Sequence, residues 1–248
     1  MRDSPLDRYI TGNYGEDFLR GSSEPYYEDE MVSLWNEDFR EALSAASDEY
    51  DAVITDPPYN VGKDYGTYKD NLEPQEYEEM LRDVSGVCER QAWVSSTTHL
   101  GAFMRALGDE ARLVVVRRGA QGPLRWGMFS QFEPLLVRGH VEERMSDLWD
   151  GIRLTGEGYF FREDTFGHPG YTPLPVLQRL IRLMTKPGET IFEPFAGTGT
   201  CLVAAKSLGR RAVGFELNEA YCEIAAKRLS QGSLDLEYPS SDTIKEQS

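Results

Sequence analysis

The stretch that decides the fold reads Ala52-Val53-Ile54-Thr55-Asp56-Pro57-Pro58-Tyr59-Asn60. Its apolar and β-branched first half predicts a buried strand. Pro57 and Pro58 end that strand, because neither has an N–H for a sheet hydrogen bond and each fixes its own φ. We therefore expect Asp56 and Tyr59 at the carboxyl end of a strand, which is the edge where open α/β sheets bind ligands.

This corner is suited to binding a planar amine. The Asp56 carboxylate and the Pro57 carbonyl oxygen can each accept one N–H of an exocyclic amino group, while the Tyr59 ring stacks on the heterocycle. The motif is short, so a plain strand and proline-rich turn with a surface acid and a packed tyrosine stays open as an alternative.

A second junction of the same kind is Thr190-Ile191-Phe192-Glu193-Pro194-Phe195-Ala196-Gly197-Thr198-Gly199-Thr200. Gly197 and Gly199 allow a ligand close to the backbone, and the helix that follows offers free N–H groups at its start. The next predicted strand ends in Glu216, where an acid binds both hydroxyls of a ribose. This order is typical of a nucleoside-cofactor site, although a plain strand–loop–helix joint is the alternative for the loop alone.

Apolar periodicity predicts the other elements. Strands are expected at 31–35, 51–55, 92–95, 112–116, 131–137 and 211–215, together with the one that runs into Glu193. Helices are expected at 39–47, 75–90, 173–185, 201–208 and 219–229. Residues 60–74 are expected to form a mobile loop over a site, and 126–129 a turn.

Composition limits the class of protein. With 248 residues, 40% of them hydrophobic, the chain suits one domain with or without an insertion. No apolar run approaches membrane-spanning length and no apolar signal core begins the chain, so we expect a cytoplasmic protein with no membrane partner. Cys88, Cys201 and Cys222 lack metal-ligand spacing and are expected to be buried thiols.

The formal net charge of −16 is unusual for a nucleic-acid-binding protein, which carries a basic footprint. Only 6 of the 26 basic residues are lysine, a bias that predicts a halophilic protein. In concentrated salt the Debye length shrinks to about 3 Å, so an acidic surface would barely repel DNA. Arg117, Arg118 and Arg125 lie in a locally basic region and are the candidates for phosphate contact, with solvated surface arginines as the alternative.

Together the two motifs resemble those of the DNA amino-methyltransferases, which use S-adenosylmethionine to modify adenine N6 or cytosine N4. Asp56-Pro57-Pro58-Tyr59 is similar to their catalytic motif and Phe195-Ala196-Gly197-Thr198-Gly199-Thr200 to their cofactor loop. The catalytic motif comes first, as in the circularly permuted β group. The resemblance covers about residues 32–230 and implies a single Rossmann-like α/β methyltransferase domain, with a mostly parallel twisted sheet and helices on both faces.

The resemblance also implies roles for individual residues. The catalytic residues would be Asp56, Pro57, Pro58 and Tyr59, and the cofactor would be bound by Asp38, Glu193, Phe195, Gly197, Thr198, Gly199, Thr200 and Glu216. Trp149 lies in a segment, 138–167, that resembles a short target-recognition insertion, and is expected to contact DNA. The family-like segment that begins at His168-Pro169 has Thr172 where the family usually has lysine.

We expect three parts: an acidic, loosely ordered arm at 1–30, which its polar composition predicts, the catalytic domain at 31–231, which the resemblance implies, and a polar tail at 232–248. The expected activity is site-specific methylation of adenine N6 in a base flipped out of double-stranded DNA, without a metal or a covalent intermediate. Asp56 rather than serine before Pro-Pro-Tyr favours adenine by resemblance. Cytosine-N4 methylation, methylation of RNA or protein, and a non-catalytic nucleic-acid-binding relative are the alternatives. A homodimer and a partner restriction nuclease are left open.

Overall fold

A computed structural model describes residues 24–43, 50–65, 68, 70–117, 124–125, 128–129, 131–150 and 172–231. Its main sheet contains β1 (Tyr27–Glu28), β2 (Val32–Trp35), β3 (Ala52–Thr55), β4 (Gln91–Val94), β5 (Arg112–Arg117), β8 (Phe132–Arg138), β9 (Leu148–Trp149), β10 (Thr190–Glu193) and β11 (Arg211–Phe215). The helices are α2 (Phe39–Leu43), α3 (Pro74–Ser85), α4 (Leu100–Leu107), α5 (Leu174–Met184), α6 (Thr200–Ser207) and α7 (Glu219–Ser230).

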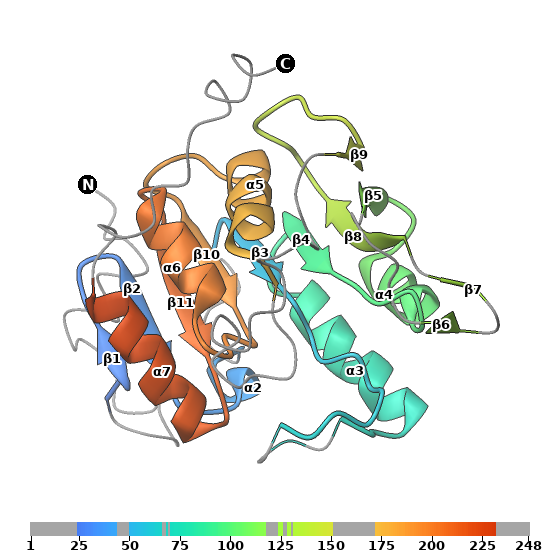
Figure 1. Cartoon of the computed structure of the whole chain (residues 1–248). Helices are drawn as coiled ribbons and strands as arrows, with labels where there is room; N and C mark the ends of the chain where they lie inside the picture. The colour runs from blue at the N-terminus through green and yellow to red at the C-terminus, as the bar shows by residue number, and fades with distance from the viewer. Residues whose placement is uncertain are drawn as a thin grey trace.

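The strands of the sheet follow the order β1-β2-β11-β10-β3-β4-β8-β5-β9 (Figure 1). From β2 to β4 every neighbouring pair is parallel. β8 is antiparallel to both β4 and β5, while β9 is parallel to β5 and β1 antiparallel to β2. The prediction of a mostly parallel sheet is therefore confirmed.

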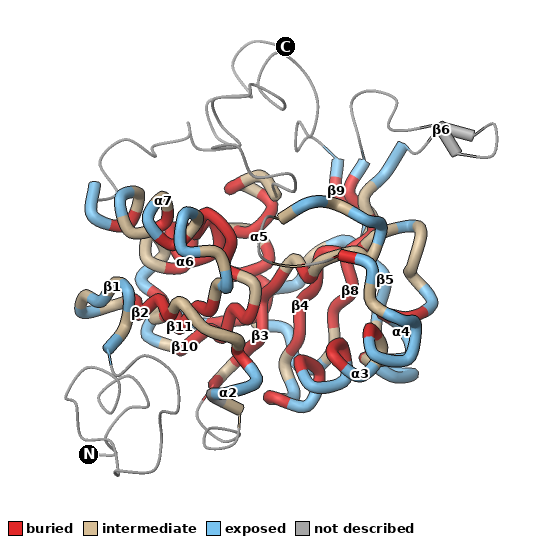
Figure 2. Tube along the Cα trace, turned by 90° about the horizontal axis from the view of Figure 1, so that it is seen from below, coloured by how far each residue is buried: buried red, intermediate tan, exposed pale blue. Residues whose placement is uncertain are grey.

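Two hydrophobic cores cover the two faces of this sheet, because successive side chains of a strand point to opposite sides. In β3, Ile54 joins a core with α5, α6 and α7, whereas Val53 joins a core with α2, α3 and α4. The strands are buried between these two layers (Figure 2). Burial on both faces explains why the strands read as continuous apolar runs, and the predicted helices on both faces are confirmed.

Helix α3 is shorter than the predicted 75–90. It begins at Pro74, whose fixed φ suits a first helical turn, and it buries the apolar stripe that includes Tyr77 and Leu81. Its last carbonyl groups are bound by side chains of the sheet, since the Gln91 amide and the Arg138 guanidinium both donate to Ser85 O. These donors satisfy the end of the helix at Ser85 and let the chain turn into β4.

Several elements differ from the sequence-based expectations. Helix α4 and strand β9 were not expected, and β1 falls within the predicted arm, of which only residues 24–30 are described. Met128–Phe129, expected within a turn, forms strand β7, because it pairs antiparallel with β6 (Leu124–Arg125). The division into arm, catalytic domain and tail stays a prediction. Among the described helices, none has the length and apolar composition that crossing a bilayer requires.

Candidate active site

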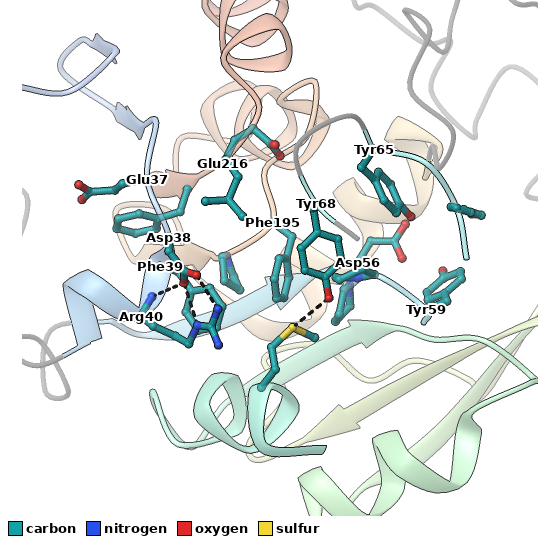
Figure 3. Close-up of a pocket in the computed structure, with 17 residues that line it drawn as sticks. Glu37, Asp38, Phe39, Arg40, Asp56, Tyr59, Tyr65, Tyr68, Phe195 and Glu216 are labelled. Atoms are coloured by element: carbon teal, nitrogen blue, oxygen red, sulfur yellow. Dashed lines mark hydrogen bonds and ion pairs between the residues drawn. The ribbon is translucent and has the colours of Figure 1, made fainter. Parts of the chain in front are cut away.

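The two motifs lie on adjacent strands. β3 and β10 are parallel neighbours, and β11 lies on the other side of β10. Asp56, Pro194 and Glu216 directly follow the last residues of these three strands. Because carboxyl ends of parallel strands meet at one edge of a sheet, the two motifs form one pocket despite their distance in sequence (Figure 3).

The pocket has a volume of about 780 Å³ with its open mouth included. Of the residues predicted to be catalytic or cofactor-binding, its wall contains Asp38, Asp56, Pro57, Pro58, Tyr59, Phe195 and Glu216. Asp38 and Arg40 lie at one end and Asp56 and Tyr59 at the other, with Phe195 between them (Figure 3). Asp38 presents an ion pair, because both of its carboxylate oxygens bind Arg40.

Asp56 is partly buried, and its carboxylate is bound by the protein itself. Its Oδ2 accepts a hydrogen bond from the Thr172 hydroxyl at 2.5 Å. Burial raises the pKa of Asp56, while hydrogen bonds from Thr172 and Tyr59 and the charge of Lys63 act in the opposite direction. Asp56 is thus an acid whose ionisation depends on a few identifiable neighbours.

The corner after Asp56 is held rigid by two side chains. The Tyr77 hydroxyl donates to Pro58 O at 2.9 Å. Asp70, which is almost completely buried, accepts the backbone N–H groups of Asn60, Val61 and Lys63 at 2.6, 3.0 and 3.1 Å. These bonds fix the backbone that follows the Pro-Pro turn, so the position of the Tyr59 side chain is set by tertiary contacts as well as by the prolines.

Glu216 is oriented by backbone donors on both sides. Its Oε2 accepts from Gly197 N at 2.9 Å and its Oε1 from Asn218 N at 2.7 Å. Burial raises the pKa of Glu216, and hydrogen bonds from the backbone N–H groups of Asn218, Gly197 and Leu217 counter that effect. A carboxylate has about four acceptor positions, so acceptor capacity remains for a ligand hydroxyl group.

Most of the predicted cofactor loop lies beside the pocket rather than in its wall. Gly197 and Gly199 have φ values of 53° and 80°, a conformation that favours glycine. A Cβ at Gly199 would also lie 2.8 Å from Ala225 Cβ, so this glycine lets α6 pack against α7. Thr198 and Thr200 are buried, and Arg228 donates to Thr198 O and to the Thr200 hydroxyl. These residues shape the loop.

Glu193 also lies behind the described wall of the pocket. Its Oε1 accepts from the Thr55 hydroxyl at 2.5 Å and from Phe195 N at 3.1 Å. Burial, together with the nearby Asp56 charge, raises the pKa of Glu193 to about 8, although the hydrogen bonds from Thr55 and Phe195 act in the opposite direction. Near neutral pH this side chain is therefore largely protonated in the free protein, and a cation nearby would favour its ionised form.

A family model described as "DNA methylase", of the N6 and N4 methyltransferases, matches residues 137–227. The chain resembles this family over that stretch, which contains the predicted cofactor loop and Glu216 but not Asp56. It is 25% identical over 229 residues to the type II methyltransferase M.HpaI of Haemophilus parainfluenzae, over 79% of this chain and 71% of the relative.

Solved structures share the fold of this chain. The PvuII DNA methyltransferase, described as cytosine-N4-specific, has a TM-score of 0.63 and 17% identity, over 89% of this chain and 92% of that one. A complex of M1.HpyAVI with S-adenosylmethionine has a TM-score of 0.57 and 18% identity, over 80% of this chain and 100% of that one.

Of the candidate DNA contacts, Trp149 and Arg117 are among the described side chains, and neither lines the pocket. Trp149 is completely buried, donates from Nε1 to Ser146 O at 2.7 Å, and has the Arg179 guanidinium 4.3 Å from its ring centroid. In this structure it packs β9 against α5 and exposes no surface to DNA. Arg117 is exposed and pairs with Asp150 at 3.1 Å. Arg118, the Arg125 side chain and His168 lie outside the described residues.

Sequence reasoning missed other residues of the site. Lys63 places its Nζ 5.2 Å from the Tyr59 ring centroid, and Tyr65 and Tyr68 line the pocket. All three lie in the stretch 60–74, which was expected to form a loop over a site. No other feature of the sequence pointed to them. Thr172 had a signal of another kind, because it departs from the family pattern, but its contact with Asp56 could not be read from the sequence.

Proposed function

We propose that this protein is a DNA methyltransferase, which transfers a methyl group from S-adenosylmethionine to the exocyclic N6 of adenine in double-stranded DNA. One observation carries the proposal. The Asp56 corner and the Glu216 carboxylate open into a single pocket, although they come from opposite ends of the chain. Methyl transfer to a base amine requires a group that binds the amine and a site that binds a nucleoside cofactor in the same cavity. We call the first of these, formed by Asp56 and the Pro57 carbonyl oxygen, the amine clamp.

The donor set of the pocket fits this cofactor. Glu216 retains acceptor capacity for a ribose hydroxyl, and Phe39 and Phe195 offer aromatic surface for the adenine ring. Glu193, behind Phe195, is the acid for the methionine ammonium group. The bound cofactor would supply a methyl group on a positively charged sulfur. Gly197, Thr198, Gly199 and Thr200 would hold the loop beside it in shape.

The chain's own residues would bind and orient the target amine. Asp56 and the Pro57 carbonyl oxygen would accept its two N–H groups, which localises the nitrogen lone pair, and Tyr59 would stack on the base. Asp56 must be ionised to accept in this way. Taking the base out of the duplex costs a few kcal/mol, which stacking and these hydrogen bonds offset. Positioning and electrostatics then provide most of the rate acceleration.

The choice of adenine rests on Asp56 before Pro-Pro-Tyr. Cytosine N4 is the second candidate, since the same clamp would accept both N–H groups of that amine and a similar fold carries a cytosine-N4-specific enzyme. A partner restriction nuclease, a homodimer, a cytoplasmic location and activity in concentrated salt belong to the same proposal.

Methyl transfer to DNA tests the proposal directly. The purified chain is incubated with methyl-labelled S-adenosylmethionine and genomic DNA, in dilute buffer and in concentrated KCl, and the digested nucleosides are separated by mass spectrometry. We expect labelled N6-methyladenine from the wild type and none from Asp56→Ala. Labelled N4-methylcytosine would select the second candidate, and absence of label in DNA at every salt concentration would refute both.

A further inference from the structure

Thr172 makes a contact that joins two distant parts of the site. Its hydroxyl donates to Oδ2 of Asp56 at 2.5 Å, across 116 positions of sequence. Thr172 is half-buried and directly precedes Pro173, the N-cap of α5. The hydroxyl therefore reaches from the start of one helix to the carboxyl end of β3.

This hydrogen bond is not needed to form the helix. The N-cap of α5 is Pro173, whose side chain has no polar group, and the Thr172 hydroxyl gives its hydrogen to Asp56 rather than to a group of the helix. The position of α5 is set by its buried apolar face, which includes Leu177, Leu180 and Ile181. Loss of the hydroxyl would leave that packing in place.

We infer that Thr172 is a positioning residue, whose hydroxyl holds one oxygen of Asp56 so that the other oxygen faces the target amine. The inference rests on the proposed function, because it assigns Thr172 a part in the same amine clamp. A carboxylate on a single side-chain bond turns freely, and a donor fixed at one of its oxygens removes that freedom. The same donor stabilises the ionised form that accepts an N–H.

Other charged and titratable groups also face Asp56. Tyr59, Lys63 and Tyr65 follow it in the chain. Tyr77 faces it from α3, and Glu193 approaches it from β10. All of these are retained when Thr172 alone is changed. Because the Thr172 bond lowers the pKa of Asp56, loss of that bond should raise this pKa further. As the pH is lowered, activity that needs ionised Asp56 would therefore be lost at a higher pH in the variant than in the wild type.

The test compares Thr172→Val, which keeps the shape and loses the hydroxyl, with Thr172→Ser, which keeps the hydroxyl. Single-turnover methyl transfer is measured across pH, and S-adenosylmethionine affinity is measured by calorimetry. We expect Thr172→Val to lose about tenfold or more of the rate near neutral pH, to shift the acid limb of the profile upward, and to keep cofactor affinity within about twofold. Thr172→Ser should retain most of the rate.

The inference is overturned by a wild-type rate and profile in Thr172→Val, by equal losses in the two variants, or by a loss confined to cofactor affinity. Asp56→Ala separates this result from the proposed function. If Asp56→Ala is inactive while Thr172→Val is unaffected, only the role of Thr172 falls. If Asp56→Ala is active, or if the wild type transfers no methyl group, the proposed function is refuted. The role of Thr172 is then refuted as well, because it depends on that function.

Discussion

The hydroxyl of Thr55 donates to Oε1 of Glu193 at 2.5 Å, which ties the last residue of β3 to the last residue of β10. Burial at this junction raises the pKa of Glu193 from its ordinary 4.5 to about 8. If Glu193 binds the cofactor ammonium, it must lose its proton on binding. S-adenosylmethionine affinity should then rise with pH, by up to about tenfold per unit between about pH 6 and 8.

Calorimetry in buffers of different ionisation enthalpy checks this, because it detects the released proton. Glu193→Gln is the matched control and should bind more weakly, with little dependence on pH. An affinity that is flat across this range in the wild type would remove Glu193 from the cofactor site. The same shift predicts that the free energy of unfolding falls as pH rises from about 5 to 8, because the unfolded state releases this proton earlier than the folded state.

Gly197 and Gly188 form a matched pair for the cofactor loop. Both have positive φ, 53° and 85°, but Gly197 donates to Glu216 whereas Gly188 precedes β10 at the opposite edge of the sheet. Leucine at either position should cost roughly 1–2 kcal/mol of stability through backbone strain. Only Gly197→Leu should also abolish S-adenosylmethionine binding in calorimetry. Normal affinity in folded Gly197→Leu would contradict its place in the site.

Arg117 is the described candidate for a phosphate contact. β5 runs in the same direction as β4 and β3, since β8 is antiparallel to both β5 and β4, so Arg117 ends its strand at the edge that holds Asp56. Its ion pair with Asp150 is exposed and therefore weak enough to be exchanged for a phosphate.

Arg117→Ala should weaken DNA binding several-fold for all sequences and reduce the slope of log affinity against log salt by about 1, measured by fluorescence anisotropy. Arg112, exposed at the opposite end of the same strand, is the control and should leave both quantities unchanged when replaced by alanine. Equal effects of the two variants would mean that only net charge matters.

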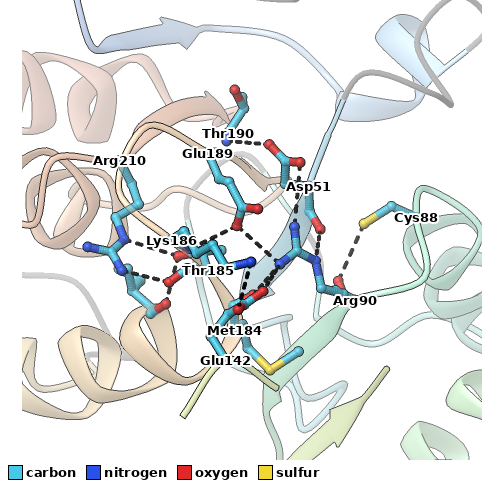
Figure 4. A network of polar contacts seen from close by, with 11 residues as sticks. Asp51, Cys88, Arg90, Glu142, Met184, Thr185, Lys186, Glu189, Thr190 and Arg210 are labelled. Carbon is cyan, nitrogen blue, oxygen red and sulfur yellow. Dashed lines mark hydrogen bonds and ion pairs between the residues drawn. The ribbon is translucent and has the colours of Figure 1, made fainter. Parts of the chain in front are cut away.

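Arg90 connects the amino ends of the strands, away from the pocket (Figure 4). It pairs with Asp51, Glu142 and Glu189 at 3.4, 3.1 and 3.1 Å, and its side chain is only 16% exposed. Arg90→Ala leaves these acids without their shared cation, so we expect a loss of about 2–3 kcal/mol in the free energy of unfolding.

Urea denaturation measures this loss. Arg105→Ala is the control, because the Arg105–Glu78 pair is exposed and should contribute little. Cofactor affinity should be unchanged in both variants, since Asp51 and Asp56 lie at opposite ends of β3. A folded Arg90→Ala protein of wild-type stability would show that the acids are satisfied without Arg90.

Elements with long apolar patterns could be predicted closely. The strand expected at 51–55 is β3 at Ala52–Thr55, and the helix expected at 219–229 is α7 at Glu219–Ser230. β9 could not be predicted, because two residues are too few for a period. Its Trp149 is buried through pairing with Val116 of β5 and contact with Arg179 of α5, and both partners are distant in sequence.

The sequence by itself determined the two strand-ending motifs, their order along the chain, and the α/β class of the fold. These follow from preferences that act over a few residues, such as the effect of proline on a strand and of glycine on a turn. The tertiary structure alone decided that β10 lies between β3 and β11, which brings Glu216 and Asp56 to one pocket, and that Thr172 binds Asp56. Strand order and such contacts depend on how segments distant in sequence pack together to bury both faces of the sheet. Local sequence patterns cannot predict this packing.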